Sequence, residues 1–132
     1  MNVIIDTSSV IAVIANEPEK KALIEITRGS TLYVPLSVPW EIGNAFSAML
    51  KRNRIDLALA RQAIEVYRRI PLQFIEVDLA QAIELAAKLG IYAYDAYIIL
   101  AALDRSYPLL ALDNGLINAA KQAFVNVLEI KS

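Results

Sequence analysis

Short apolar runs alternate along the chain with longer segments whose apolar positions recur at helical spacing. The runs predict five β-strands, at residues 2–5, 31–35, 73–77, 108–112 and 125–130. The longer segments predict seven helices, at residues 8–18, 18–29, 40–53, 57–70, 79–89, 92–103 and 115–123. Strands that alternate with helices predict an α/β fold in which helices cover both faces of a parallel sheet.

Start and stop signals support several of these boundaries. Pro39 suits the first turn of the third helix, and Asp56 is a capping residue for the fourth. Asp78, followed by Gln81, predicts a capping box at the start of the fifth helix. Gly90 predicts the end of the same helix, since glycine adopts the left-handed conformation that often follows a helix.

The composition limits the chemistry that the chain can perform. At 132 residues, with 57% hydrophobic and 20% charged residues, residues 1–132 are predicted to form a single domain. There is no cysteine and no histidine, which excludes thiolate metal sites, a Ser-His-Asp triad and an imidazole base. No uncharged run is long enough to span a membrane and the apolar N-terminus lacks a basic leader, so a soluble, cytoplasmic protein is predicted.

Four acidic residues stand apart from all other charged side chains. Each is the only charged residue of a long stretch: Asp6 in 1–16, Glu41 in 29–50, Asp95 in 90–103 and Asp113 in 106–120. An ionised carboxylate in apolar surroundings is costly unless it is paired, hydrogen-bonded or bound to a metal. None of the four has a Lys or Arg nearby in the sequence to pair with.

Two interpretations of these acids are open. Each one alone is typical of the start of a helix, where a carboxylate caps the backbone or interacts with the helix dipole. In a parallel sheet, however, the strand-to-helix junctions lie at one edge, where ligands bind. This geometry brings Asp6, Asp113 and Glu41 to the same edge, but it does not fix the position of Asp95, which follows a helix.

A cluster of carboxylates predicts a cation. Like charges at close range repel one another, so three or four carboxylates persist together mainly when a positive ion neutralises them. Mg²⁺ and Mn²⁺ prefer oxygen ligands and retain several waters. The pattern therefore predicts metal-assisted hydrolysis of a phosphate ester by an activated water.

Four sequence stretches resemble the PIN domain family, and most closely its small VapC-type toxins. They are "VIIDTSSVIA", "WEIGNAF", "YAYDAYIILAA" and "PLLALDNGL", in the order that the family has them over the whole chain. The resemblance implies a three-layer α/β/α fold with a five-stranded parallel sheet flanked by helices. It also implies a Mg²⁺- or Mn²⁺-dependent endoribonuclease, the toxin of a type II toxin–antitoxin pair, with RNA as substrate, a VapB-type protein antitoxin as partner and a homodimeric state.

The resemblance also assigns roles to individual residues. Asp6, Glu41, Asp95 and Asp113 match the four acidic positions of the family, which are catalytic and bind the metal. Thr7 matches the hydroxyl residue that often follows the first acid, and Asn44 matches an asparagine frequent one helical turn after the second. The chain departs from the pattern at Ala111, where many relatives have Ser or Thr two residues before the last acid.

RNA contacts are expected on a basic segment. Residues 51–69 contain six basic residues and only two acidic ones, Asp56 and Glu65. The basic residues are Lys51, Arg52, Arg54, Arg61, Arg68 and Arg69, of which the first four are the candidates for contact with RNA. Such a group would neutralise phosphates without reading the base sequence. Two other interpretations explain the basic segment equally well: a solvated helical hairpin, or a surface that binds the antitoxin.

Aromatic residues near the acids have two interpretations. Tyr92, Tyr94 and Tyr97 surround Asp95, and Trp40 precedes Glu41. They could stack on bases, but helical spacing favours packing of Tyr94 on Tyr97, and packing is preferred for Trp40 too. The apolar helices that contain "AFSAML" and "AIEVYRRIPL" are the predicted homodimer face.

Two alternative functions remain. A catalytically inactive PIN-like domain that binds RNA or protein would have the same sequence pattern. A Mg²⁺-dependent phosphoacceptor regulatory domain would also use an acidic pocket, but it would need a lysine after a late strand. After "PLLAL" the chain has Asp113 instead, and no suitable lysine follows the last strand.

Overall fold

The computed structural model describes residues 1–130 and contains one five-stranded parallel sheet. The strands are β1 (Asn2–Ile5), β2 (Thr31–Pro35), β3 (Leu72–Ile75), β4 (Leu109–Leu110) and β5 (Val127–Leu128). Their order across the sheet is β3-β2-β1-β4-β5. The predicted α/β fold with a five-stranded parallel sheet is therefore confirmed.

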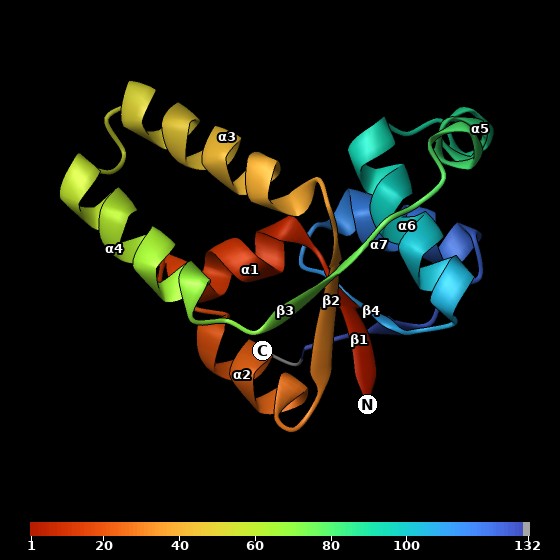
Figure 1. Ribbon diagram of the computed structural model, residues 1–132, viewed down its shortest axis with the longest axis horizontal. Coiled ribbons are helices and arrows are strands. Elements are labelled where there is room, and N and C mark those ends of the chain that lie inside the picture. Colours follow the sequence, from red (N-terminus) through yellow and green to blue (C-terminus); the bar gives the residue numbers. More distant parts are fainter. Residues whose placement is uncertain (131–132) are drawn as a thin grey trace.

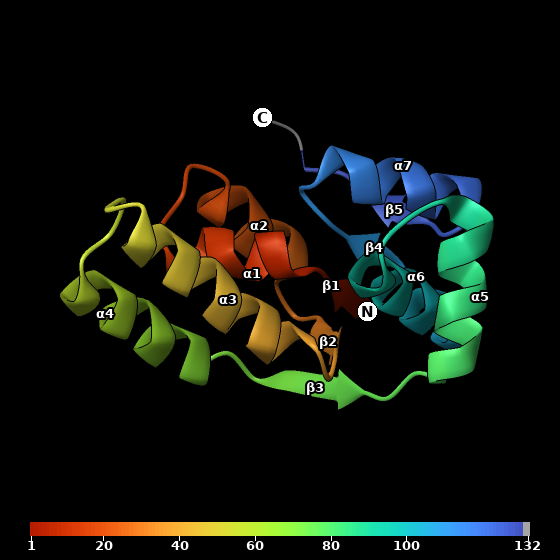
Figure 2. The same ribbon diagram turned by 90° about the horizontal axis from the view of Figure 1, so that it is seen from above.

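Helices flank the sheet on both faces. They are α1 (Thr7–Ile14), α2 (Lys20–Thr27), α3 (Val38–Lys51), α4 (Leu57–Arg68), α5 (Leu79–Leu89), α6 (Ala93–Arg105) and α7 (Asn114–Gln122). Figure 1 shows α3 and α4 as an antiparallel pair that projects away from the sheet. Figure 2 shows the sheet nearly edge-on, with α1 to α4 on one side and α5 and α6 on the other.

The strand order creates a switch point next to β1. The chain moves outward from β1 to β2 and β3, then returns to the other side of β1 to form β4. The carboxyl ends of β1 and β4 therefore form a topological switch point of the sheet. Ligands bind at this position in doubly wound sheets.

Helix starts follow the expected capping chemistry. The side chains of Asp56 and Asp78 accept backbone N–H bonds from Leu59 and Gln81, each at 2.8 Å. Gly90 has φ 67°, the left-handed conformation predicted for the end of α5.

Six elements are shorter than predicted: α1, α2, α4, β3, β4 and β5. α1 ends at Ile14 rather than near residue 18, because Asn16 turns left-handed (φ 57°) and the Glu17 N–H closes onto the Ala12 carbonyl. β5 starts at Val127 because the Val125 N–H bonds to the Ala120 carbonyl and so belongs to the end of α7. β4 covers only Leu109–Leu110.

The core lies on both sides of the central strands. Val3, Ile4, Leu109 and Leu110 are fully buried, and α6 contacts β1 and β2 and is buried from Ile98 to Ala102. Within residues 1–130, no single helix is long and apolar enough to cross a membrane; α5 and α6 meet the length and hydropathy criteria only as a pair, bent by 109°.

Candidate active site

Four acidic side chains start from four different elements around the switch point; they are called the acidic edge below. Asp6 follows β1 directly and Asp113 follows β4 by a short connection. Glu41 lies in the first turn of α3 and Asp95 in the first turn of α6. Each therefore stands where its backbone element begins or ends, as a ligand site at a parallel sheet requires.

Asp6 is the most buried acid and is held by its own helix. Its side chain is 3% exposed. Oδ1 accepts the Ser9 N–H at 3.0 Å, and Oδ2 accepts the Ser8 hydroxyl at 2.5 Å. Burial raises the pKa of Asp6, the bonds from Ser8 and Ser9 lower it in part, and the charge of Asp113 raises it again.

Glu41 is half-buried and is held from the start of its helix. The Ser37 hydroxyl donates to Glu41 Oε2 at 2.9 Å. Burial raises the Glu41 pKa, Ser37 and the nearby Thr7 hydroxyl lower it in part, and the charges of Asp95 and Asp6 raise it. Thr7 is close enough to influence this carboxylate, but its Oγ1 is buried without a well-formed hydrogen bond.

Asp95 and Asp113 are more accessible. Asp95 is half-buried, and its pKa is raised first by burial and then by the charges of Asp113 and Asp6. Asp113 is exposed and caps α7, where its Oδ2 accepts the Leu116 N–H at 2.8 Å. The start of α6 thus lies within electrostatic range of the ends of β1 and β4, a placement that strand order alone did not specify.

Within residues 1–130, carboxylate charges act on Asp6, Glu41 and Asp95 without a compensating cation. The groups that shift the pKa values of Asp6, Glu41 and Asp95 are hydroxyls, a backbone N–H and other carboxylates, with no Lys or Arg among them. Such an arrangement stores repulsion that a positive ion would relieve.

The donor set suits a hard divalent ion, although the side chains are not closed around one. All four acids supply carboxylate oxygens, the ligands that Mg²⁺ and Mn²⁺ prefer. The buried hydroxyls of Thr7 and Ser9, beside Asp6, have unused hydrogen-bonding capacity. Within residues 1–130, however, no three acidic side chains converge closely enough to hold one ion together, so binding would require side-chain rotation.

The other predicted residues fall in three places. Asn44 is exposed one turn further along α3. Lys51, Arg52 and Arg54 are exposed at the turn between α3 and α4, and Arg61 is exposed on α4. Arg68, on α4 as well, is bonded to Glu65 at 2.9 Å, which reduces the free positive charge of the segment.

Some of the aromatic residues pack against one another and others are exposed. Tyr94 and Tyr97 pack edge-to-face with ring centroids 6.0 Å apart, as the spacing predicts. Trp40 is 78% exposed and Tyr92 is 87% exposed, so the packing interpretation is wrong for Trp40.

Two hydroxyl residues of the site were not predicted. Ser37 positions Glu41 and Ser8 positions Asp6. Ser37 lies four residues before Glu41, a spacing that places two helical side chains on one face, and this signal could have identified it. Ser8 is the first residue of the predicted helix 8–18, a position that does not indicate which group its hydroxyl bonds.

Comparison with known proteins identifies the family. The sequence pattern of the PIN domain matches residues 3–122. The chain therefore belongs to the PIN domain family.

Curated relatives narrow the resemblance within that family. The VapC ribonuclease Mb0985 of Mycobacterium bovis is 32% identical over 102 residues, which is 75% of this chain and 76% of the relative. Ribonuclease VapC9 of Mycobacterium tuberculosis matches with the same identity and coverage. The predicted resemblance to VapC proteins is confirmed.

Solved structures share the fold. PAE2754 from Pyrobaculum aerophilum aligns with a TM-score of 0.73 at 21% identity, over 90% of this chain and 79% of that one. The structure of VapBC2 from Rickettsia felis, bound to a DNA fragment from its promoter, aligns with a TM-score of 0.68 at 14% identity. That alignment covers 99% of this chain and 100% of the other, so the two proteins share the fold over nearly their full aligned lengths.

Proposed function

We propose that this protein is a Mg²⁺- or Mn²⁺-dependent endoribonuclease and the toxin of a type II toxin–antitoxin pair. The observation that carries the proposal is that four carboxylates start from four elements around the switch point of the sheet, and that the charges acting on Asp6, Glu41 and Asp95 include no Lys or Arg of the described residues. The names of the VapC relatives supply the reaction class.

The residues of the site have two proposed roles, to fix the carboxylates and to transfer protons. Asp6, Asp95, Asp113 and Glu41 would hold the ion, which supplies Lewis acidity and an activated water for attack on phosphorus. Ser8 and the Ser9 N–H fix the Asp6 carboxylate, and Ser37 fixes Glu41. Hydrolysis then joins the water oxygen to phosphorus, breaks the bond to the bridging oxygen and delivers a proton to that oxygen.

Glu41 is the proposed proton carrier. In the metal-free protein, burial and the charges of Asp95 and Asp6 raise the pKa of Glu41 above its ordinary value, and a base works best when its pKa lies near the working pH. Ser37 holds only Oε2, which leaves Oε1 free to accept the proton of the attacking water.

Asp95→Asn tests the proposal directly. Wild-type protein should cleave RNA with Mn²⁺ or Mg²⁺, and EDTA should stop it. Asp95→Asn should lower the cleavage rate at least about 100-fold, beyond the loss typical of a residue that only supports a metal ligand. Asp104→Asn is the matched control, because Asp104 is an exposed carboxylate on the same helix outside the acidic edge. Equal cleavage by the Asp95→Asn variant would show that another nuclease does the work.

The proposed partners are a VapB-type antitoxin and a second copy of the chain, acting on RNA in the cytoplasm. The helices first predicted as the homodimer face are largely used inside the molecule, since Phe46 and Ala63 are buried and Ile64 packs against the core. A better candidate surface is exposed near the edge strand β3. Leu36 and Leu79 line one hollow there and are 49% and 60% exposed, and Ile83, one turn after Leu79 on α5, is 55% exposed.

A further inference from the structure

An apolar cavity lies between the sheet and the helices α1 and α2. Its volume is about 370 Å³, about twice the 180 Å³ of the hollow beside β3. Side chains of β1, β2, α1 and α2 line it, together with the segment that joins α4 to β3 (Figure 1). None of the four acids of the acidic edge lines the cavity, so it is a separate feature of the molecule.

The floor of the cavity is apolar. Ile5, Val10 and Leu23 come from β1, α1 and α2, and each is at most 4% exposed. Ile24, which is 43% exposed, and the exposed Pro71 form part of the mouth. A water molecule on this floor finds no side chain that forms hydrogen bonds, so an apolar group that replaces the water is favoured.

The lining also contains three polar side chains, of which two are positively charged. Thr27 Oγ1 donates to the Leu23 carbonyl at 2.7 Å and is therefore tied to its own helix. Arg28 Nη2 bonds to Glu25 Oε1 at 3.1 Å in an exposed ion pair. Arg69 is exposed and makes no ion pair within residues 1–130. Because no acidic side chain of the described residues lines the cavity, Arg69 gives its mouth an uncompensated positive charge.

An apolar floor below a positive charge fits a small molecule that has a hydrocarbon tail and an anionic head. Cavities that bind small molecules have volumes of about 300–1,000 Å³ and combine apolar walls with a few polar or charged groups. The volume and the lining of this cavity both agree with that description. A flexible tail reaches the buried floor, whereas the flat surface of a protein would cover only the mouth.

We propose that this cavity binds a medium-chain carboxylate, with its tail on Ile5 and Val10 and its carboxylate at Arg69. Arg69 is assigned to the head because Arg28 is already paired. The proposal does not depend on the proposed ribonuclease function. The cavity nevertheless adjoins the segment that carries Asp6, since Ile5 precedes this acid and the Val10 N–H bonds to the Asp6 carbonyl at 3.2 Å.

The length of the tail tests the role of the floor. Hexanoate, octanoate and decanoate are each titrated into the full chain below their micelle concentrations, and binding is followed by isothermal titration calorimetry. Each added CH₂ should tighten binding about 4-fold, or about 15-fold from octanoate to decanoate. An affinity that does not depend on tail length would overturn the proposal, and so would the absence of binding.

Octanol, which has the same tail length as octanoate but no charge, tests the role of Arg69. Arg69→Ala should weaken octanoate binding about 2- to 5-fold, the contribution of one exposed ion pair, and leave octanol binding unchanged. Arg105→Ala is the matched control, because Arg105 is an exposed arginine on α6 that does not line the cavity. Equal losses in the two variants would show that only net charge matters and would overturn the assignment of Arg69.

Ile24→Glu tests whether the ligand occupies this cavity. The exposed position lets the fold accept a charge, but the new carboxylate should repel the ligand and weaken octanoate binding at least about 10-fold. Circular dichroism checks that every variant is folded. Undiminished binding in Ile24→Glu would place the ligand elsewhere and overturn the proposal. A lower sedimenting mass of Ile24→Glu without octanoate would also overturn it and assign the cavity to a contact between copies.

Discussion

At the scale of single residues, Asp6 combines two roles that the sequence presents as alternatives. One oxygen caps α1 through the Ser9 N–H and the other accepts the Ser8 hydroxyl, yet the carboxylate also lies among three further acids. Asp113 likewise caps α7 through one oxygen. A helix cap fixes a carboxylate precisely where a sheet edge needs a ligand, so the capping and site interpretations support each other.

Sequence identifies the acids better than the groups that hold them. A charge isolated in an apolar stretch is visible in the sequence, which is why all four acids could be selected before the structure. The partner of a hydroxyl depends on its rotamer and on the local backbone, so Ser37 and Ser8 became apparent only from their bonds to Glu41 and Asp6. The exposure of Trp40 could not be predicted, because helical spacing does not say which face a helix buries when its first turn projects beyond the sheet.

Phe124 is a residue at which stability can be gained. It is left-handed, with φ 66°, at the end of α7, where the Val125 N–H bonds to the Ala120 carbonyl. Glycine usually occupies this position, because a side chain there costs about 1–2 kcal/mol. Phe124→Gly should therefore raise the free energy of unfolding by about 1 kcal/mol, or the melting temperature by about 3–5 °C. Thermal denaturation by circular dichroism measures the change.

Phe124→Ala separates the backbone from the ring. Alanine keeps the left-handed penalty and removes a ring that is 93% exposed, so its melting temperature should stay close to that of the wild type. If alanine stabilises as much as glycine does, the unfavourable term is the exposed ring and the backbone explanation fails.

At the scale of elements, the helices show which apolar surfaces remain unused. α3 and α4 turn their apolar faces onto the core, whereas α5 leaves Leu79 and Ile83 in solvent on one face. In the proposed homodimer, Ile83→Glu should therefore convert the dimer into a monomer, because a buried charge without a partner is strongly unfavourable in an apolar interface. Sedimentation velocity measures the mass. Leu59→Glu is the matched control, with a similar exposure of 52% on α4, and it should remain dimeric. Equal masses for Ile83→Glu and wild type would exclude this surface.

At the scale of the whole molecule, alternation of strands and helices was sufficient to predict a parallel sheet with helices on both faces. The order of the strands could not be deduced from the residue pattern. The position of Asp95 depends on that order, so it could not be deduced either. That position depends on the return of the chain from β3 to β4, which carries α6 across β1 and β2. The contact is long-range in sequence, so no local signal encodes it.

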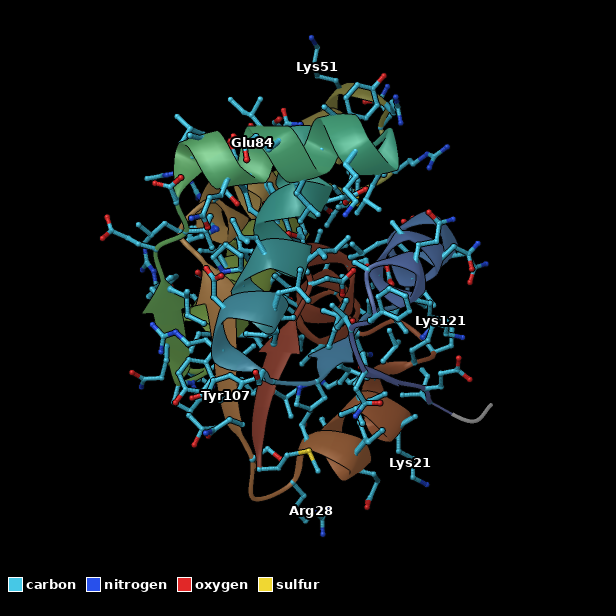
Figure 3. The ribbon with its side chains drawn as sticks, turned by 90° about the vertical axis from the view of Figure 1, so that its right-hand side faces the viewer. Lys21, Arg28, Lys51, Glu84, Tyr107 and Lys121 are labelled. Atoms are coloured by element: carbon cyan, nitrogen blue, oxygen red, sulfur yellow. The ribbon has the colours of Figure 1, made fainter. Side chains whose placement is uncertain are left out.

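The α3–α4 turn gives the molecule a positive outer end beyond the acidic edge. Lys51, Arg52 and Arg54 are exposed there, so they should contribute to RNA affinity through phosphates and not through base sequence. Arg52→Ala should weaken binding similarly for RNAs of different sequence and lower the slope of log affinity against log salt by about 1. Filter binding over a salt series measures both quantities. Lys21→Ala is the control, because Lys21 is an exposed basic residue on α2, toward the opposite end of the molecule from Lys51 (Figure 3). An equal change of slope in both variants would show that only net charge matters.

Burial of Asp95, together with repulsion from the other acids, should make metal-free protein sensitive to pH. Burial and neighbouring carboxylates raise the pKa of Asp95 above its ordinary value of 3.8, so above that value the unfolded chain releases this proton before the folded protein does. The folded state then binds more protons, and its stability must fall as pH rises through the interval between the two pKa values.

The Asp95→Asn variant lacks this titration and the repulsion from Asp6 and Asp113. In EDTA its melting temperature should equal that of the wild type below about pH 3.8 and exceed it by about 2–5 °C at neutral pH. Mn²⁺ should reverse the order at neutral pH, since only the wild type retains the full set of ligands. A difference between the two proteins that stays constant from pH 3 to 8, as differential scanning fluorimetry would record it, would show that Asp95 bears no repulsion from the other acids.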